Sequence, residues 1–112
     1  MTMNRDEARE IYDFVGEFKE GFARVGKDGK EFHVRRDYKP AYEARFHNVG
    51  FFSEGLASAC EKRDGKEFHI RPDGTPAYPQ RFDSVSPFYN GRARVTLKKE
   101  SFSIQSDGKS VF

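Results

Sequence analysis

The stretch GKEFHVRRDYKPAY, residues 29–42, returns almost unchanged as GKEFHIRPDGTPAY at residues 65–78. Eleven of the seventeen aligned positions in residues 29–45 and 65–81 are identical. The residues upstream align as well, and a weaker third copy follows, so the spacing is 34 and then 36 residues. Self-similarity at a fixed period indicates a repeat architecture. The sequence therefore predicts one repeat domain, residues 1–112, of about three units: residues 11–45, 46–81 and 82–112.

Apolar residues alternate with polar residues inside each unit. Phe32 and Val34 flank His33, and the same alternation surrounds His69 and Ser103. A period of two, bounded by glycine and aspartate, is typical of β-strands. Asp-Gly pairs between these segments are residue types that tight turns favour. The sequence predicts an all-β fold, a tandem array of β-hairpin-rich repeats of 34–36 residues with about three short strands each.

Residues 4–11, NRDEAREI, are the one segment that favours a helix. Asn4 is a good N-cap, and the acidic Asp6 and Glu7 suit the positive end of the helix dipole. Because terminal units of such arrays are usually atypical, we expect this short helical cap to cover the open end of the first unit.

The composition limits the classes of function and the location. Charged residues make up 34% of the 112 residues, but the net charge is only +2, which argues against a dedicated polyanion binder. The polar N-terminus lacks the apolar segment of a signal peptide, and no apolar run reaches membrane-spanning length. Cys60 is the single cysteine, which fits a reducing compartment. We expect a cytoplasmic protein without a membrane segment.

The polar residues that recur in register are the candidate binding residues. His33 and Arg35 face the same way two residues apart, and His69 and Arg71 repeat the pair. Stacked units would align these four residues into a stripe that binds a carboxylate, a phosphate or a partner backbone. Tyr38 would add a stacking surface. The other interpretation is structural: each histidine hydrogen-bonds a neighbouring turn, and we favour it because repeats copy structural residues equally readily.

The sequence does not predict catalysis or metal binding. Two histidines one unit apart, with no histidine at the third position, do not supply the three or four ligands of a metal site. Cys60 lies outside any signature of a cysteine nucleophile, and no glycine-rich phosphate loop precedes a helix. We expect no enzyme and no cofactor. Glycan or nucleic-acid binding through a His/Arg/Tyr face is the alternative to protein binding.

The repeated motifs resemble a known family. The pattern F-x-E-G-x-A-x-V, then D-G-K, a D-G-x-P turn and an aromatic before F-D-x-V resembles the bacterial WG β-repeat over residues 11–112. The chain departs from that family because it contains no tryptophan. Glu31-Phe32 and Glu67-Phe68 stand where the family has its Trp-Gly pair. We infer that three phenylalanines are the anchors instead: Phe32, Phe68 and Phe102.

The resemblance implies a non-enzymatic repeat whose partner is another protein. An inhibitor or an adaptor would fit a domain of this size, and a bacterial or phage source would fit the family. Self-association through an unpaired edge strand is a further expectation, because three units are few for a closed ring.

Overall fold

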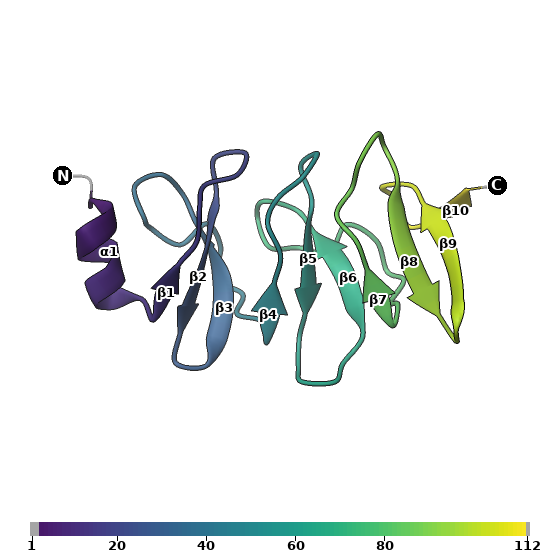
Figure 1. Cartoon of the computed structure of the whole chain (residues 1–112), viewed down its shortest axis with the longest axis horizontal. Helices are drawn as coiled ribbons and strands as arrows, with labels where there is room; N and C mark the ends of the chain where they lie inside the picture. Colours follow the sequence, from purple (N-terminus) through teal and green to yellow (C-terminus); the bar gives the residue numbers. More distant parts are fainter. Residues whose placement is uncertain (1–2, 112) are drawn as a thin grey trace.

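The computed structural model describes residues 3–111 and has the form of a short rod. Its dimensions are 48 × 27 × 19 Å. A helix lies at one end, and three small antiparallel sheets follow one another along the long axis (Figure 1). The chain therefore runs from one end of the rod to the other, as a tandem array should.

Each sheet draws its strands from one predicted unit, so the all-β array of hairpin-rich repeats is confirmed. The sheet orders are β1-β2-β3, β4-β5-β6 and β10-β9-β8-β7. The strands are β1 (Phe14–Val15), β2 (Ala23–Lys27), β3 (Lys30–Val34), β4 (Asn48–Val49), β5 (Ala57–Cys60), β6 (Glu67–Ile70), β7 (Ser84–Val85), β8 (Ala93–Leu97), β9 (Glu100–Ile104) and β10 (Ser110–Val111).

The hairpin turns fix the register of each sheet. Asp28 and Gly29 both have positive φ, +55° and +79°, as the mirror-image two-residue turn between β2 and β3 requires. Between β8 and β9 the same turn is made by Lys98 and Lys99, which also have positive φ. A lysine adopts this conformation less readily than glycine, so the third unit has a more strained turn than the first.

The predicted helix is present as α1 (Arg5–Ile11). The Asn4 side chain accepts a hydrogen bond from the Glu7 amide, and the Glu7 carboxylate accepts one from the Asn4 amide, which completes a capping box. Ala8 is fully buried against the first sheet. Arg5 donates to the backbone oxygens of Val15 and Gly16, so α1 is tied to the first unit by side-chain bonds as well as by packing.

The core runs through the whole rod, because the middle sheet is covered on both faces. In β6 the consecutive residues Phe68, His69 and Ile70 are all fully buried, although their side chains point alternately to opposite faces. Each face meets a neighbouring unit. Alternation therefore separates two buried faces here, whereas in a half-exposed sheet it separates core from solvent.

Candidate binding surface

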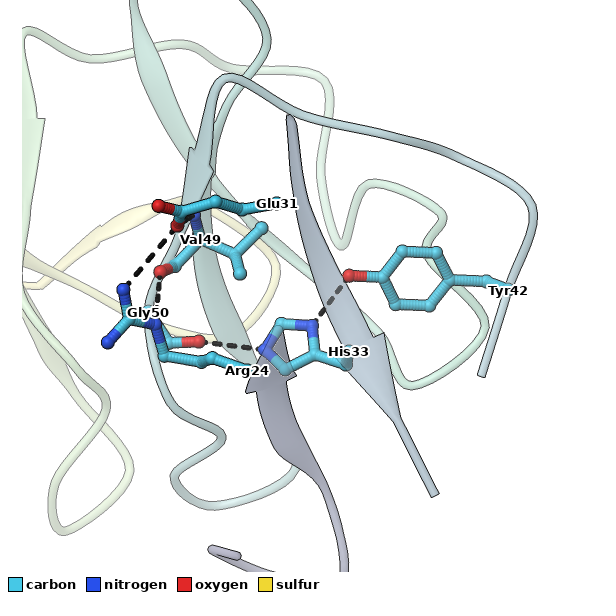
Figure 2. Close-up of polar contacts among 6 residues, drawn as sticks. All are labelled: Arg24, Glu31, His33, Tyr42, Val49 and Gly50. Atoms are coloured by element: carbon cyan, nitrogen blue, oxygen red, sulfur yellow. Dashed lines mark hydrogen bonds and ion pairs between the residues drawn. The ribbon is translucent and has the colours of Figure 1, made fainter. Parts of the chain in front are cut away.

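The two repeated histidines join neighbouring units. His33 has its Nε2 2.8 Å from the Gly50 oxygen and its Nδ1 2.6 Å from the Tyr42 hydroxyl (Figure 2). A carbonyl oxygen only accepts, so Nε2 carries the proton and donates, and the Tyr42 hydroxyl donates to Nδ1. His69 repeats the arrangement, at 2.8 Å from the Ser86 oxygen and 2.5 Å from the Tyr78 hydroxyl.

Both histidines are held in the neutral form. Burial lowers the pKa of His33 to about 4, and the hydrogen bond to the Gly50 carbonyl offsets part of this lowering. Burial also lowers the pKa of His69 and raises the pKa of Tyr42. At neutral pH each imidazole therefore serves as one donor and one acceptor.

The structure places the histidines away from any surface. Both His33 and His69 are 0% exposed, and each packs on the phenylalanine ring of the following unit, at 4.4 Å from Phe52 and 4.6 Å from Phe88 between ring centroids. The prediction that they form part of a recognition stripe is wrong in this conformation, because neither can contact a partner. The structural interpretation, a histidine bonded to a neighbouring turn, describes the observed geometry.

The paired arginines lie on the surface and are separated from the histidines. Arg35 and Arg71 are exposed, but each guanidinium donates to the turn that follows its own strand. These bonds brace the turn, so the bidentate donor set that was expected to hold a ligand is already engaged. The acceptors are the oxygens of Pro40 and Ala41 for Arg35, and those of Thr75, Pro76 and Ala77 for Arg71.

Tyr38 fills a position that the later units give to glycine. It has a φ of +64°, and its counterpart Gly74 has a φ of +84°. A Cβ at Gly74 would lie 2.7 Å from the ring of Tyr42 in the preceding unit. The first unit has helix α1 instead of a sheet on that side, so the Tyr38 side chain fills the space and packs 5.4 Å from the Phe18 ring. Tyr38 is only 8% exposed, which corrects its prediction as a stacking surface.

Two repeated glutamates, which were not among the predicted binding residues, also connect the units. A Glu31 carboxylate oxygen accepts from the Val49 amide at 3.0 Å, and the same oxygen accepts from Arg24 (Figure 2). Glu67 accepts from the Val85 amide at 2.9 Å in the same way. The signal was present in the sequence, because these glutamates share the strand face of the repeated histidines.

A second pair of glutamates links the loops along one side of the rod. The Glu20 carboxylate accepts from the amides of Glu54 and Gly55, at 2.7 and 2.8 Å. The Glu54 carboxylate then accepts from the amides of Asn90 and Gly91, at 2.6 and 2.8 Å. Each carboxylate thus satisfies two backbone donors of the next turn, and the three loops are fixed relative to one another.

A comparison with known families agrees with these repeats. The sequence profile of the family described as "WG containing repeat" matches residues 11–30 and 70–99. These two segments of the chain match the WG-repeat family. No curated protein and no solved structure matches it.

The repeats of this chain are anchored by phenylalanine, whereas the WG-repeat family is anchored by tryptophan. Phe32 and Phe68 are buried, and each carries an arginine of the same chain over its ring face, Arg45 at 3.7 Å and Arg81 at 3.9 Å. Phe102, the third anchor, is only half-buried. The anchor rings of Phe32 and Phe68 are therefore fully enclosed, and that of Phe102 is not.

The three loops that these glutamates link form one side of the repeat array, which we call the loop ridge. It consists of residues 16–22, 50–56 and 86–92 and lies on the upper edge in Figure 1. Phe51 is 45% exposed and Tyr89 is 76% exposed, on adjacent loops of this ridge. The Ser53 hydroxyl donates to the Phe88 oxygen at 2.7 Å, so the loops that carry the two aromatics are joined directly. Aromatic side chains are enriched at protein–protein interfaces.

Neither a metal cluster nor a membrane-spanning helix is found in residues 3–111. No group of three or more His, Cys, Asp or Glu side chains is placed to hold a metal ion there. Within the same residues, no helix is both long enough and apolar enough to cross a membrane.

Proposed function

We propose that this WG-repeat module is a non-enzymatic protein that binds another protein through the loop ridge. The exposed aromatics Phe51 and Tyr89, on loops locked together by side-chain to backbone hydrogen bonds, carry the proposal. Exposed aromatics supply contact area, and a rigid frame reduces the entropy lost on binding. A small, rigid module of this kind suits an inhibitor or an adaptor in the bacterial cytoplasm, where the free thiol of Cys60 stays reduced.

The test compares capture by two matched double variants. Phe51→Ser/Tyr89→Ser removes the aromatics of the ridge, and Ile11→Ser/Phe14→Ser removes the two exposed apolar residues near helix α1, which are 43% and 36% exposed. Each variant is immobilised beside the wild type, cross-linked in a lysate of the source cell, and the captured proteins are identified by mass spectrometry. We expect one protein to be lost only with the ridge variant. Equal capture by all three forms would contradict the proposal.

Nucleic-acid binding is the second candidate, supported by one observation. Tyr89, Arg92 and Arg94 are all exposed in the third unit, and an aromatic beside arginines is a stacking platform for single strands. The predicted glycan or nucleic-acid face around His33, His69 and Tyr38 does not contribute, since those residues are buried. Affinity for an oligonucleotide that falls steeply with salt would favour this candidate, and salt-insensitive or absent binding would favour the protein partner.

A further inference from the structure

The junction between the first two units places a lysine beside a histidine. Glu31 and Phe46 exchange backbone hydrogen bonds of 2.8 and 3.0 Å across this junction. The next residues along the two segments, Lys30 and His47, therefore lie directly opposite each other with their side chains on the same side. In residues 3–111 no carboxylate forms an ion pair with the Lys30 ammonium.

The second junction has a carboxylate at the aligned position. Glu67 and Phe82 exchange backbone hydrogen bonds of 2.7 and 2.9 Å, so Lys66 and Asp83 are the opposed residues there. The Lys66 ammonium donates to the Asp83 carboxylate. The second junction thus contains within the chain the lysine–carboxylate pair that the first junction lacks.

A groove of about 350 Å³ lies beside Lys30 and His47, on the side of the rod opposite the loop ridge (Figure 1). It is formed by parts of the first sheet and by the start of the second unit. Its lining residues all fall within residues 13–48, so the described part of the chain forms it entirely. A volume of this size is enough for a small ligand.

Phe14 supplies an apolar wall of this groove. It pairs with Gly26 in the first sheet, and a Cβ at Gly26 would lie 2.4 Å from the Phe14 ring, so the ring lies across the glycine. The ring is fixed in this position but is still 36% exposed. The aligned residues in the later units are Asn48 and Ser84, so only the first junction has an aromatic wall.

The charges that line the groove favour a ligand with one negative charge. Lys27 and Lys30 line it together with Asp13 and Glu31. The Glu31 carboxylate is paired with Arg24 at 3.4 Å, which leaves the two lysines against Asp13. A single carboxylate balances this set, whereas a ligand with several negative charges would be repelled by Asp13.

We propose that this groove binds a small aromatic carboxylic acid. Its carboxylate lies between Lys30 and His47, in the place that the Asp83 carboxylate has beside Lys66 at the second junction. An imidazole can donate a hydrogen bond to a carboxylate in either of its protonation states. The aromatic ring of the acid packs against the exposed part of the Phe14 ring. The ligand thus matches one charged wall and one aromatic wall.

The first experiment titrates the whole ¹⁵N-labelled chain with phenylacetate. We expect amide shifts around residues 26, 30, 47 and 48, and none around the aligned residues 66, 83 and 84. Two matched probes are phenylacetamide, which keeps the ring without the charge, and acetate, which keeps the charge without the ring. Each should bind about tenfold more weakly, because each loses its contact with one wall. Equal affinity of the three probes, or shifts centred elsewhere, would overturn the proposal.

His47→Asp tests the charged wall. The substitution gives the first junction the lysine–aspartate pair of the second, so phenylacetate affinity should fall by about tenfold or more. Aspartate already stands at the aligned positions of the first and third units, as Asp13 and Asp83, so the repeat accommodates it. Lys109→Gln is the control, since it changes the net charge equally at an exposed position of the third unit. Undiminished phenylacetate binding by His47→Asp would exclude this site.

Phe14→Leu tests the aromatic wall separately. Leucine keeps an apolar side chain but removes the ring, so the preference for phenylacetate over acetate should fall about threefold. The affinity for acetate itself should not change, because Lys30 and His47 are retained. A variant that keeps the full preference for phenylacetate would contradict the proposed ring contact.

The groove is independent of the loop ridge, so the two double variants of the capture test should give opposite results. Phe51→Ser/Tyr89→Ser should bind phenylacetate as the wild type does. Ile11→Ser/Phe14→Ser should lose the preference for phenylacetate over acetate and still capture the protein partner. If the ridge variant loses phenylacetate, the two surfaces are one, and the proposal of a separate groove is wrong.

Discussion

The junctions between units and the outer face of the third unit use the same sequence positions with different residues. At the junctions, a glutamate and a histidine on the third strand and a glutamate in the ridge loop reach into the next unit. The third unit has short, uncharged residues instead. The side chains that span the two junctions are thus not repeated in the third unit. The replacements are Ser101, Ser103 and Asn90.

The N-terminal end shows the complementary solution. There Arg5 of helix α1 donates to the Gly16 oxygen, at the position where His33 reaches Gly50 and His69 reaches Ser86 in the inner units. Arg5 is therefore a substitute donor in the first unit, whereas the third unit has Ser103 at the position of the two histidines.

The anchor phenylalanines should show the largest difference in unfolding free energy between a substitution in the middle unit and the same substitution in the third unit. Phe68→Ala should lower the free energy of unfolding by about 3–5 kcal/mol, because the ring is 1% exposed and its loss leaves a cavity. Phe102→Ala should cost about half as much, since that ring is only half-buried. Urea denaturation of both variants measures the difference. Equal losses would mean that the last unit is packed as tightly as the middle one.

The second prediction concerns pH. Because the pKa of His33 is about 4 in the folded protein and returns to its ordinary value of 6.5 on unfolding, the unfolded chain binds more protons between these values. Stability is therefore fully present above pH 6.5 and falls with acidification, by about 1.4 kcal/mol per pH unit from this residue. His69, whose pKa is also lowered, acts in the same direction.

Urea denaturation between about pH 7 and pH 4 tests this, with His33→Gln beside the wild type. Glutamine keeps a donor for the Gly50 oxygen but does not titrate, so the variant should lose less stability on acidification. Identical slopes for the two proteins would show that His33 does not titrate between the two states.

The third prediction compares two strand positions that align. Glu67→Ala leaves the Val85 amide without its acceptor in a partly buried junction and should cost about 1–3 kcal/mol. Ser101→Ala, at the same position of the last unit, should change stability by less than about 0.5 kcal/mol because its side chain is exposed. Thermal unfolding followed by circular dichroism separates the two values. If Ser101→Ala loses as much stability as Glu67→Ala, the glutamate at the junction does not contribute more than the serine at the same position of the third unit.

The smallest effect is expected on the loop ridge. Glu54→Gln keeps the size of the side chain but replaces one acceptor oxygen by an amide donor, so one of its two bonds, to Asn90 or Gly91, should be lost at about 1 kcal/mol. Glu61→Gln, at an exposed glutamate outside the ridge, is the control. Amide hydrogen exchange of Gly91 should rise in the first variant only. Unchanged exchange in Glu54→Gln would show that the ridge is not held by this carboxylate.

Much of the fold could be predicted because the decisive signals are local. The period of the repeat, the alternation around His33 and the Asp-Gly turns all act within a few residues, and the cap at Asn4 depends only on Glu7 three positions later. These signals specify strands, turns and helix before any packing is known.

The candidate site could not be predicted from the same signals. Alternation tells which side chains share a face of a strand, but it does not tell whether that face meets solvent or another unit. A surface stripe through His33 and His69 was compatible with the sequence for that reason. The replacement of glycine by Tyr38 at a repeated turn was the one residue-level sign that the first unit has different neighbours.

The middle unit, residues 46–81, presents one set of groups to the unit before it and the complementary set to the unit after it. It is thus a building block whose two sides are complementary to each other. A second copy inserted after residue 81 would meet the same contacts on both sides that the first copy already makes. The rod would in this sense grow in whole steps, one step for each middle block that is added.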